Sequence, residues 1–397
     1  MKRITSDIVI SGGGVAGLTA AAAFGAAGFS VVIVDPALPV TNAAFEGADL
    51  RTTAFLQPAQ SFLDDIGLWG RLAEYATPLQ VMRIADVSGE GRGARVSADF
   101  DAADISDKPF GWNLPNWLLR REMLARLKEL PNVEFHAGTG FVSLLPRETE
   151  ALVMLTGGLQ VRAKLVIGAD GRHSAVREAA DIDIKTHRYG QKAISFAVTH
   201  PSPHDNVSTE IHRSGGPFTF VPLPDHEGEP CSAVVWMEKG AEVNRLMALS
   251  DEEFESEALT RSAALYGSLT LATRRMVWPI ISQVASALSA PRTALVAEAA
   301  HVVPPIGAQG LNMSLNDIAT LLDLAREHDL GSRKMLDAYQ KARHGDIKLR
   351  VNGIDALNRA SMSNAPFLQD LRVAGIKALH DAAPVRRGLM KLGLGAS

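Results

Sequence analysis

Apolar residues gather near the N-terminus in two short runs, residues 8–10 and 31–34, with a segment rich in Gly and Ala between them. Both runs are β-branched and apolar at every position, which is typical of parallel strands buried on both faces. The small residues between them suit a tight turn followed by a closely packed helix. The pattern therefore predicts a strand, a helix and a second parallel strand.

The same segment has a competing interpretation, because Lys2 and Arg3 precede an uncharged stretch that runs from residue 8 to 34. A basic start followed by an apolar run is also the pattern of a signal peptide or a membrane span. Three consecutive glycines, residues 12–14, would each cost such a helix about 1 kcal/mol relative to alanine. The glycines favour the strand, turn and helix.

Helix-like and strand-like spacing alternate over the next part of the chain. Helical spacing covers residues 61–75 and 118–130, and Pro131 ends the second of these. Strand-like segments are residues 80–96, a hairpin around Gly157 and Gly158 formed by 152–155 and 159–161, and a buried strand at 164–168.

From residue 192 to about 278 the predicted strands follow one another without helices between them. These strands are 193–199, 207–211, 218–222 and 232–237, and they indicate a separate, inserted antiparallel sheet with a helix after it. A short buried strand at 293–297 and a helix at 313–327 return to the first pattern. The remainder, to about residue 383, is helical and charged.

Composition narrows the classes of function. The chain has 397 residues, of which 46% are hydrophobic, and 40 basic against 44 acidic residues give a net charge of -4. The length suggests two or three domains with large cores, and there is no basic field that nucleic acid would require. Cys231 is the single cysteine, so the chain has no internal disulfide, which suits the cytoplasm.

Glycine spacing at the N-terminal turn points to a nucleotide. Gly12, Gly14 and Gly17 have the G-x-G-x-x-G spacing. The first glycine permits a tight turn, the second lets a pyrophosphate approach the backbone, and the third lets helix and strand pack closely. Asp35 follows the second strand and can accept hydrogen bonds from ribose hydroxyls. The spacing alone does not say which dinucleotide is bound.

Two later segments add to this turn. Asp170 and Gly171 follow a strand directly, a pattern that an ordinary strand-to-helix turn also has. Residues 297–317 contain Glu298, His301 and a glycine-rich turn that opens a helix, whose backbone N–H groups and dipole could stabilise an anion.

These three segments, in this order, resemble the single-component FAD-dependent aromatic hydroxylases, the group that includes para-hydroxybenzoate hydroxylase. The resemblance covers about the first 330 residues. It is strongest to the ubiquinone-biosynthesis branch, whose pattern is matched by Asp49-x-Arg51-x-x-Ala54, residues 66–69 and residues 216–223 with 235–236.

The resemblance implies an α/β fold: a Rossmann-like FAD-binding domain of the glutathione-reductase-like type, with an inserted antiparallel-sheet substrate domain and a helical C-terminus. The expected parts are residues 1–80, 106–185 and 281–330 for the FAD-binding domain, 81–105 for strands joining the substrate sheet, 186–280 for the substrate domain, and 331–397 for the helical region.

The resemblance also implies roles for individual residues. The adenosine end of FAD would be held by Gly12, Gly14, Val15, Ala16, Gly17 and Asp35. The pyrophosphate or ribityl region would be contacted by Arg51 and Arg121, the pyrophosphate by Asp170 and the ribityl chain by Glu298. The isoalloxazine would be lined by Pro305, Gly310, Leu311 and Asn312.

The chain departs from the family pattern at two places. It has Ala297-Glu298 where the family has Gly-Asp, and Ala308 where the family has the first glycine of Gly-Gln-Gly. Glutamate keeps the acceptor on a longer side chain, whereas alanine removes freedom at positive φ. The departures concern the flavin end of the site, and the chain is still expected to bind flavin.

The activity that the resemblance implies is a monooxygenase reaction. NADPH or NADH would reduce FAD, O2 would add at the flavin C4a, and the terminal oxygen of that hydroperoxide would pass to an electron-rich ring, foremost a polyprenyl phenol of ubiquinone biosynthesis. Two alternatives stay open: a hydroxylase of small soluble phenols, and a non-catalytic scaffold of the same fold. The ring position and the choice between NADH and NADPH also stay open.

Other candidate features have plainer interpretations. Glu298 and His301 fit one half of a di-iron motif, but the strand-and-turn context is wrong for a helical bundle. Cys231 is expected to be an inert core residue. Alternating side chains could be core or could line a tunnel for a prenyl chain; they are Phe196, Phe218, Phe220, Val235 and Trp236.

Residues 383–394 form a basic and apolar tail that could touch the inner membrane or a partner, or could be a frayed end. The partners expected are therefore an aromatic substrate and O2, with peripheral membrane contact, a biosynthetic complex and a homodimer left open.

Overall fold

A parallel sheet forms the first layer of the fold in the computed structural model, which describes residues 3–88, 94–363 and 365–394. Its strands lie in the order β18-β19-β11-β1-β2-β8, and the five from β19 to β8 are mutually parallel. A hairpin of β9 and β10 extends the sheet from β11. The bounds are β1 Arg3–Ser11, β2 Val31–Asp35, β8 Val133–Ala137, β9 Phe141–Pro146, β10 Ala151–Leu155, β11 Gln160–Gly168, β18 Ser289–Ala290 and β19 Thr293–Leu295.

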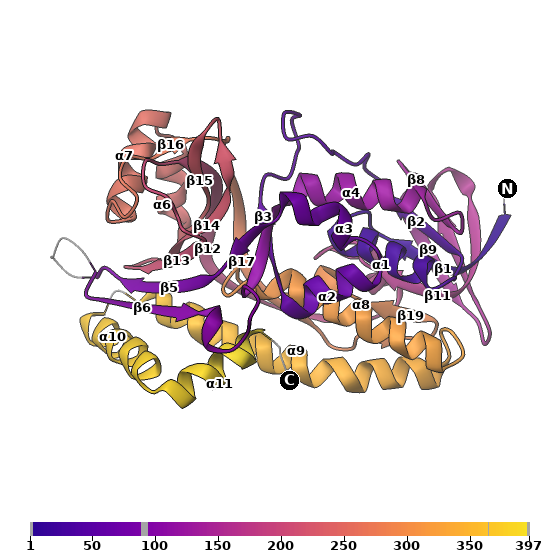
Figure 1. The fold of residues 1–397 in the computed structure, drawn as a ribbon. Helices are drawn as coiled ribbons and strands as arrows, with labels where there is room; N and C mark the ends of the chain where they lie inside the picture. The colour runs from indigo at the N-terminus through magenta and orange to yellow at the C-terminus, as the bar shows by residue number, and fades with distance from the viewer. Residues whose placement is uncertain (1–2, 89–93, 364, 395–397) are drawn as a thin grey trace.

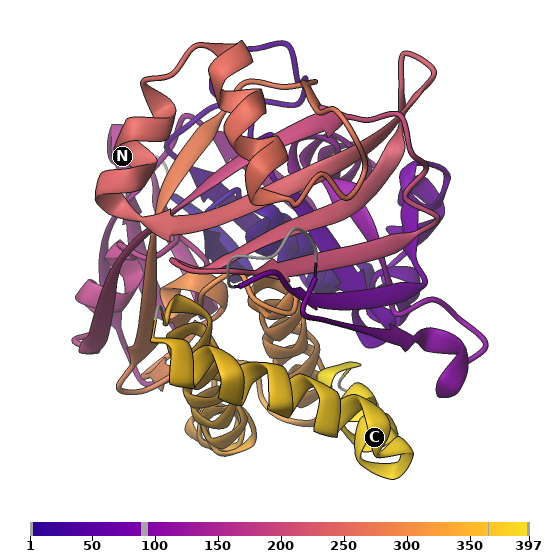
Figure 2. The same ribbon diagram turned by 90° about the vertical axis from the view of Figure 1, so that its left-hand side faces the viewer.

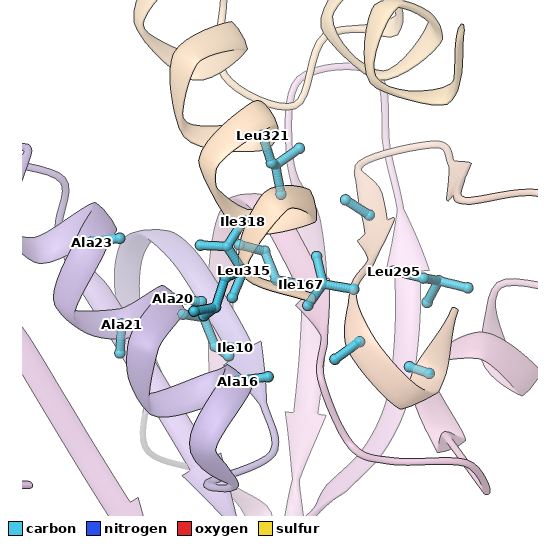
Figure 3. Close-up of a cluster of buried hydrophobic side chains, with 14 of the residues drawn as sticks. Ile10, Ala16, Ala20, Ala21, Ala23, Ile167, Leu295, Leu315, Ile318 and Leu321 are labelled. Atoms are coloured by element: carbon cyan, nitrogen blue, oxygen red, sulfur yellow. The ribbon is translucent and has the colours of Figure 1, made fainter. Parts of the chain in front are cut away.

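Helices α1 (Val15–Ala26) and α8 (Gln309–Glu327) pack together on this sheet. Figure 3 shows their contact: Ile10, Ile167 and Leu295 from three strands meet Ala16 and Ala20 of α1 and Leu315, Ile318 and Leu321 of α8. The alanines let α1 approach closely. The predicted unit of strand, helix and strand is confirmed, and so is the later helix, which starts at Gln309, four residues before the expected start.

A second sheet of nine strands lies beside the first layer, and α6 (Gly240–Met247) and α7 (Asp251–Arg261) cover its outer face (Figure 1). The order is β20-β17-β12-β15-β14-β13-β5-β6, with β16 paired to β12. The bounds are β5 Val81–Asp86, β6 Val96–Asp101, β12 Ile184–Thr199, β13 Val207–His212, β14 Pro217–His226, β15 Glu229–Lys239, β16 Thr270–Leu271, β17 Met276–Ala285 and β20 His301–Val302.

The strands predicted between residues 193 and 237 pair antiparallel, as expected, and the joining strand β5 adds one parallel pair to the sheet. Strand β5 pairs with β13 in parallel. Backbone N–H of Gln80 donates to the carbonyl of Asn206 at 2.9 Å, so β5 enters the sheet beside the start of β13 and runs in the same direction. The pairing joins segments far apart in sequence, and no local pattern reports it.

A small three-stranded sheet, β3-β7-β4, lies between the two large ones (Figure 1). Its strands are β3 Thr52–Leu56, β4 Thr77–Leu79 and β7 Gly111–Pro115, and the helices nearby are α2 Gln57–Asp65, α3 Trp69–Leu72 and α4 Asn116–Lys128. The single helix expected at 61–75 is broken between α2 and α3, where Gly67 takes a φ of +73°. Of the strand expected at 80–96, residues 89–93 lie outside the described part of the chain.

Three helices end the chain and lie along the lower side of the molecule in Figures 1 and 2: α9 (Arg333–Met362), α10 (Pro366–Asp381) and α11 (Ala383–Leu394). The predicted helical C-terminus is confirmed. Across residues 3–88, 94–363 and 365–394, none of the helices combines the length and the apolar composition that a bilayer span needs.

Candidate functional site

The predicted cofactor segments meet at one edge of the parallel sheet. Strands β1, β2, β11 and β19 all end there, because they are parallel. Backbone N–H of Ala169 donates to Ser11 at 2.8 Å, and that of Val296 donates to Gly168 at 3.0 Å. The carboxyl edge of an open α/β sheet is where such folds bind ligands.

The three glycines of the N-terminal turn differ in what surrounds them. Gly12 has a φ of +113°, and a Cβ there would lie 2.2 Å from the carbonyl oxygen of Ala169. A Cβ at Gly17 would lie 1.9 Å from the carbonyl oxygen of Gly12. By contrast, a Cβ at Gly14 would meet no atom within 4 Å. Gly12 and Gly17 are therefore needed by the protein's own packing, whereas Gly14 borders open space at the N-terminus of α1.

Asp35 lies at the end of β2 and holds this turn. Its Oδ2 accepts a hydrogen bond from the backbone N–H of Gly13 at 2.6 Å, and its Oδ1 accepts one from Ala37 at 2.8 Å. A carboxylate oxygen has two lone pairs, so each oxygen keeps an acceptor site for a ligand hydroxyl. Val15 and Ala16 form the first turn of α1, directly after Gly14.

Asp170 is occupied by its own chain. Its carboxylate accepts hydrogen bonds from the hydroxyl of Ser174, from the backbone N–H of Val176 at 3.1 Å and from the hydroxyl of Ser11 at 3.4 Å. These bonds fasten the start of α5 (Ala175–Ala179) to the end of β1. The structure thus gives Asp170 a structural role at the edge where the cofactor segments meet.

Arg51 lies just before β3 and is held by a bidentate pair with Asp49, at 2.8 and 2.7 Å. Its guanidinium stacks over Trp278, 4.3 Å from the ring centroid. Burial alone would raise the pKa of Asp49, but Arg51, together with Asn116 and Arg120, outweighs burial and lowers it below the usual 3.8. Asp49 and Trp278 were not proposed as site residues; the Asp49-x-Arg51 pattern signals the first, and no local pattern signals the second.

Glu298 projects from a short turn whose neighbours Ala297 and Ala299 are buried, and Glu298 itself is exposed. Its carboxylate has no hydrogen-bond partner among the described residues. Its charge acts on Arg51: burial lowers the pKa of Arg51, whereas Asp49 and then Glu298 raise it. Glu298 is therefore a free acceptor facing the Arg51 region.

The turn before α8 adopts a backbone form that favours glycine. Ala308 has a φ of +56°, as does Ala297. The side chain of Asn312 fixes the turn. Its Nδ2 donates to the carbonyl of Ala308 at 2.6 Å and, on β3, to that of Ala54 at 2.8 Å, and its Oδ1 accepts from the backbone N–H of Leu56 at 2.9 Å. The neighbouring positions Pro305 and Gly310 are exposed, and Leu311 is half-buried.

Arg121 lies on α4, which packs along α1. Its Nε donates to Glu122 at 2.7 Å, and its guanidinium lies 5.2 Å from the ring centroid of Tyr75 and 5.6 Å from that of Trp117.

A buried charge network lies behind the turn, and no local sequence pattern signals it. His301 Nε2 lies 2.6 Å from Asp317 Oδ2, and Arg343 Nε donates to Asp317 Oδ1 at 2.8 Å. All three side chains are almost fully buried. Through Asp346 the network reaches Arg350, which donates to Gln309 at 2.9 Å. His301 therefore serves to hold α8 and α9 behind the glycine-rich turn.

The second sheet offers two faces of different character. Four of the five aromatic and aliphatic side chains considered for a tunnel, Phe196, Phe218, Phe220 and Trp236, are buried with residues of α6 and α7. Val235 and Trp278 point the other way and pack against the core of the first layer. On that inner face the strand positions are Ala193, Ser195, Ala197, Thr199, Thr219, Val221, Leu223, Ala233, Val235, Met237, Met276, Trp278 and Ile280. These positions on β12, β14, β15 and β17 carry no charge, whereas on β13 and β5 the register places Glu210, His212 and Asp86 on the same face.

Comparison with known proteins identifies the class. A family described as an FAD binding domain matches residues 5–351. The ubiquinone hydroxylase UbiL of Rhodospirillum rubrum is 33% identical over 98% of this chain and 90% of its own length. The 3-demethoxyubiquinol 3-hydroxylase of Escherichia coli is 27% identical over 100% of both chains.

Solved structures show the same fold. The p-nitrophenol 4-monooxygenase PnpA of Pseudomonas putida superposes with a TM-score of 0.80 at 20% identity, over 99% of both chains. PqsL of Pseudomonas aeruginosa, solved with 2-aminobenzoylacetate, has a TM-score of 0.79 at 22% identity, over 94% of this chain and 100% of its own.

The chain therefore belongs to the FAD binding domain family. Within that family it is an FAD-dependent monooxygenase of the aromatic-hydroxylase type, in the branch of the ubiquinone-biosynthesis hydroxylases. The expected fold class, a Rossmann-like FAD-binding domain with an inserted antiparallel-sheet domain and a helical C-terminus, is confirmed.

Proposed function

We propose that this monooxygenase hydroxylates a neutral, prenylated phenol, as an enzyme of ubiquinone biosynthesis, with NADPH or NADH as the electron donor. The observation that carries the proposal is the inner face of the second sheet. Along β12, β14, β15 and β17 that face is apolar or weakly polar at every position named above. The charged groups beside it already have partners, since Arg51 pairs with Asp49, Glu210 with His212 and Asp86 with Arg372, so a carboxylated substrate would find no unpaired positive charge among the residues described there. Leaving a buried substrate charge unpaired would cost several kcal/mol.

The residues at the sheet edge fit FAD. Open space at Gly14 leaves room for a pyrophosphate at the N-terminus of α1, where backbone N–H groups and the helix dipole favour an anion. The spare acceptor sites of Asp35 suit the adenosine ribose hydroxyls, and the free carboxylate of Glu298 suits the ribityl hydroxyls. Arg51, held flat between Asp49 and Trp278, and Arg121 supply positive charge nearby. Asp170 would act on the pyrophosphate through the turn that it fastens.

Bound FAD supplies the redox chemistry, activation of O2 included, and the protein supplies position and environment. The turn from Pro305 to Asn312 would line the isoalloxazine, with Gly310 and Leu311 at the start of α8. The N-terminus of α8 would stabilise negative charge on the ring. The apolar inner face would exclude water and hold the phenol ring between the second sheet and the cofactor. The nicotinamide donor would bind transiently on the FAD-binding domain.

A hydroxylase of small soluble phenols is the second candidate, and the p-nitrophenol 4-monooxygenase PnpA shares the fold. The test is turnover by the purified protein with FAD and either nicotinamide donor. The substrates compared would be a prenylated phenol in detergent, a short neutral phenol and 4-hydroxybenzoate.

Hydroxylation of the prenylated phenol, found by mass spectrometry and coupled to donor oxidation, supports the proposal. Turnover of short phenols alone would assign the second candidate. FAD binding without substrate-coupled oxygen consumption for any phenol would assign a non-catalytic scaffold.

A further inference from the structure

Helix α10 exposes several of its apolar side chains. Phe367 and Leu371 are 71% and 52% exposed, and Ala374 and Ala378 are also exposed. Steps of four, three and four residues place all four on one stripe of the helix. A surface helix normally turns such a stripe toward the core.

The opposite side of α10 is fixed to the protein by polar groups. Arg372 Nε donates to Asp86 Oδ2 at 2.6 Å, and Asp86 is fully buried. Arg372 and Gln369 both donate to the carbonyl of Arg213 at 3.3 Å. Rolling the helix to bury Phe367 would leave the buried carboxylate of Asp86 without its charged partner, which is strongly unfavourable. The apolar stripe is thus held outward.

Helix α11 is arranged in the same way. Met390 is buried with Ala102 and Phe110, and Arg386 pairs with Asp104 at 3.0 Å. On the outside, Val385 is 48% exposed, and Arg387 and Lys391 are exposed, as is Lys377 on α10. Both helices lie on the lower side of the molecule (Figures 1 and 2). We call a subset of the exposed side chains of α10 and α11 the lower face: Phe367, Leu371, Ala374, Lys377, Ala378, Val385, Arg387 and Lys391. Two acidic residues of these helices are also exposed, Asp370, which pairs with Arg95, and Asp381 at the end of α10.

Charge is distributed unevenly along the chain. Residues 333–397 contain twelve Lys and Arg against five Asp, a net charge of +7. The whole chain has a net charge of -4, so the other 332 residues carry -11. The helical C-terminus is therefore a basic region on an acidic protein.

We propose that the lower face docks on a lipid bilayer that contains anionic phospholipid. Exposed Phe and Leu beside Lys and Arg is the composition of a helix that lies in a membrane interface. Each basic side chain near an anionic surface is attracted to it. The acidic remainder of the chain would be repelled, which orients the molecule on the bilayer.

A second copy of the chain fits this face less well. A two-fold dimer brings the same surface of both copies together, so two faces that each carry Lys377, Arg387 and Lys391 would lie against each other. Like charges placed across an interface are unfavourable. The inference does not rest on the substrate proposed above.

The test is sedimentation of the full-length, FAD-loaded protein with vesicles of phosphatidylcholine, with and without phosphatidylglycerol. We expect binding to the anionic vesicles that weakens in high salt. The double variant Phe367→Ser/Leu371→Ser and the triple variant Lys377→Gln/Arg387→Gln/Lys391→Gln should each weaken it about tenfold or more. The matched control is Val142→Ser/Leu145→Ser, which removes two equally exposed apolar side chains from β9, at the far end of the molecule in Figure 1.

Each outcome of this test leads to a different conclusion about the lower face. Loss of vesicle binding in both lower-face variants, with normal binding in the control and unchanged turnover of detergent-solubilised substrate, supports the docking face. Wild-type protein that does not bind vesicles, or variants that bind as well as wild type, would overturn it. A dimer found by light scattering that the serine variant dissociates, in protein that ignores vesicles, would assign the face to a second copy.

Discussion

Two alanines occupy backbone positions that favour glycine, and both belong to the flavin end of the site. Ala297 and Ala308 each have a φ of +56°. An L-residue in this region costs roughly 1–2 kcal/mol, whereas glycine enters it freely but loses more chain entropy on folding. The departures seen in the sequence therefore change stability without changing the path of the backbone.

Replacing Ala308 by Gly should raise the free energy of unfolding by up to about 1 kcal/mol, because relief of backbone strain exceeds the added chain entropy. Denaturant unfolding of the FAD-free protein measures this. Ala342→Gly, at an exposed position in the middle of α9, is the matched control and should lower the free energy of unfolding by about 1 kcal/mol. Equal losses in both variants would contradict the strain at Ala308.

Cys231 shows how burial decides the chemistry of a single side chain. It is almost fully buried on β15, and burial, with a smaller effect of Asp225, raises the pKa of its thiol to about 11. The thiolate is the reactive form. At about pH 8.5, where a free thiol is half ionised, alkylation of the native protein should be slow, and it should accelerate only as the pH approaches that raised pKa.

Mass spectrometry after timed exposure to iodoacetamide measures the alkylation rate of Cys231. The same protein in guanidinium chloride is the control and should react at once. Rapid labelling of the folded protein at about pH 8.5 would show that Cys231 is accessible and would contradict its assignment as an inert core residue.

At the scale of elements, the sequence predicts a helix or a strand pairing only where the residues that determine it are close together in the chain. The unit β1, α1 and β2 was predictable because its apolar runs and its glycines are contiguous. The parallel pair of β5 and β13 was not, because the partners are more than a hundred residues apart and share no pattern. Arg51 has contacts of both kinds: Asp49 is two residues away in sequence, whereas Trp278 is distant in sequence and lies against Arg51 only in the folded chain.

The network around Asp317 joins elements in the same hidden way. Asp317 on α8 bonds His301 of β20 and Arg343 of α9, and all three are almost fully buried. Removing the carboxylate in Asp317→Ala leaves the charge of Arg343 without this partner, which should lower the free energy of unfolding by about 3–5 kcal/mol.

Thermal and denaturant unfolding measure the loss, and Asp323→Ala is the control on the same helix. Asp323 is exposed and, among the residues that the structure describes, pairs only with Arg326, so its removal should change stability by about 0.5 kcal/mol or less. Asp317→Asn keeps the shape and should retain more stability than Asp317→Ala. Equal stability of Asp317→Ala and Asp323→Ala would mean that the network does not hold α8 and α9 together.

For the whole molecule, the candidate cofactor residues come from distant parts of the chain: the turn after β1, the end of β2, the start of β3, and the turns before and after β20. A ligand that contacts all of these stabilises the folded chain as one unit. At a concentration of one hundred times its Kd, FAD should add about 2.7 kcal/mol to the free energy of unfolding.

Substitutions in the glycine turn can separate stabilisation by bound FAD from the stability of the FAD-free protein. Gly14 caps α1 with ordinary φ and ψ, its missing Cβ faces open space, and threonine is about as good a cap as glycine. Gly14→Thr should therefore leave the FAD-free protein as stable as wild type and block the pyrophosphate. If its affinity for FAD falls a hundredfold, the same FAD concentration adds only about 0.4 kcal/mol to the free energy of unfolding.

Gly17→Ala is the contrasting variant. Its Cβ would lie 1.9 Å from the carbonyl oxygen of Gly12, so it should destabilise the protein even without FAD. Melting curves across an FAD titration distinguish the two, and a Gly14→Thr protein stabilised by FAD as strongly as wild type would exclude a pyrophosphate at the N-terminus of α1.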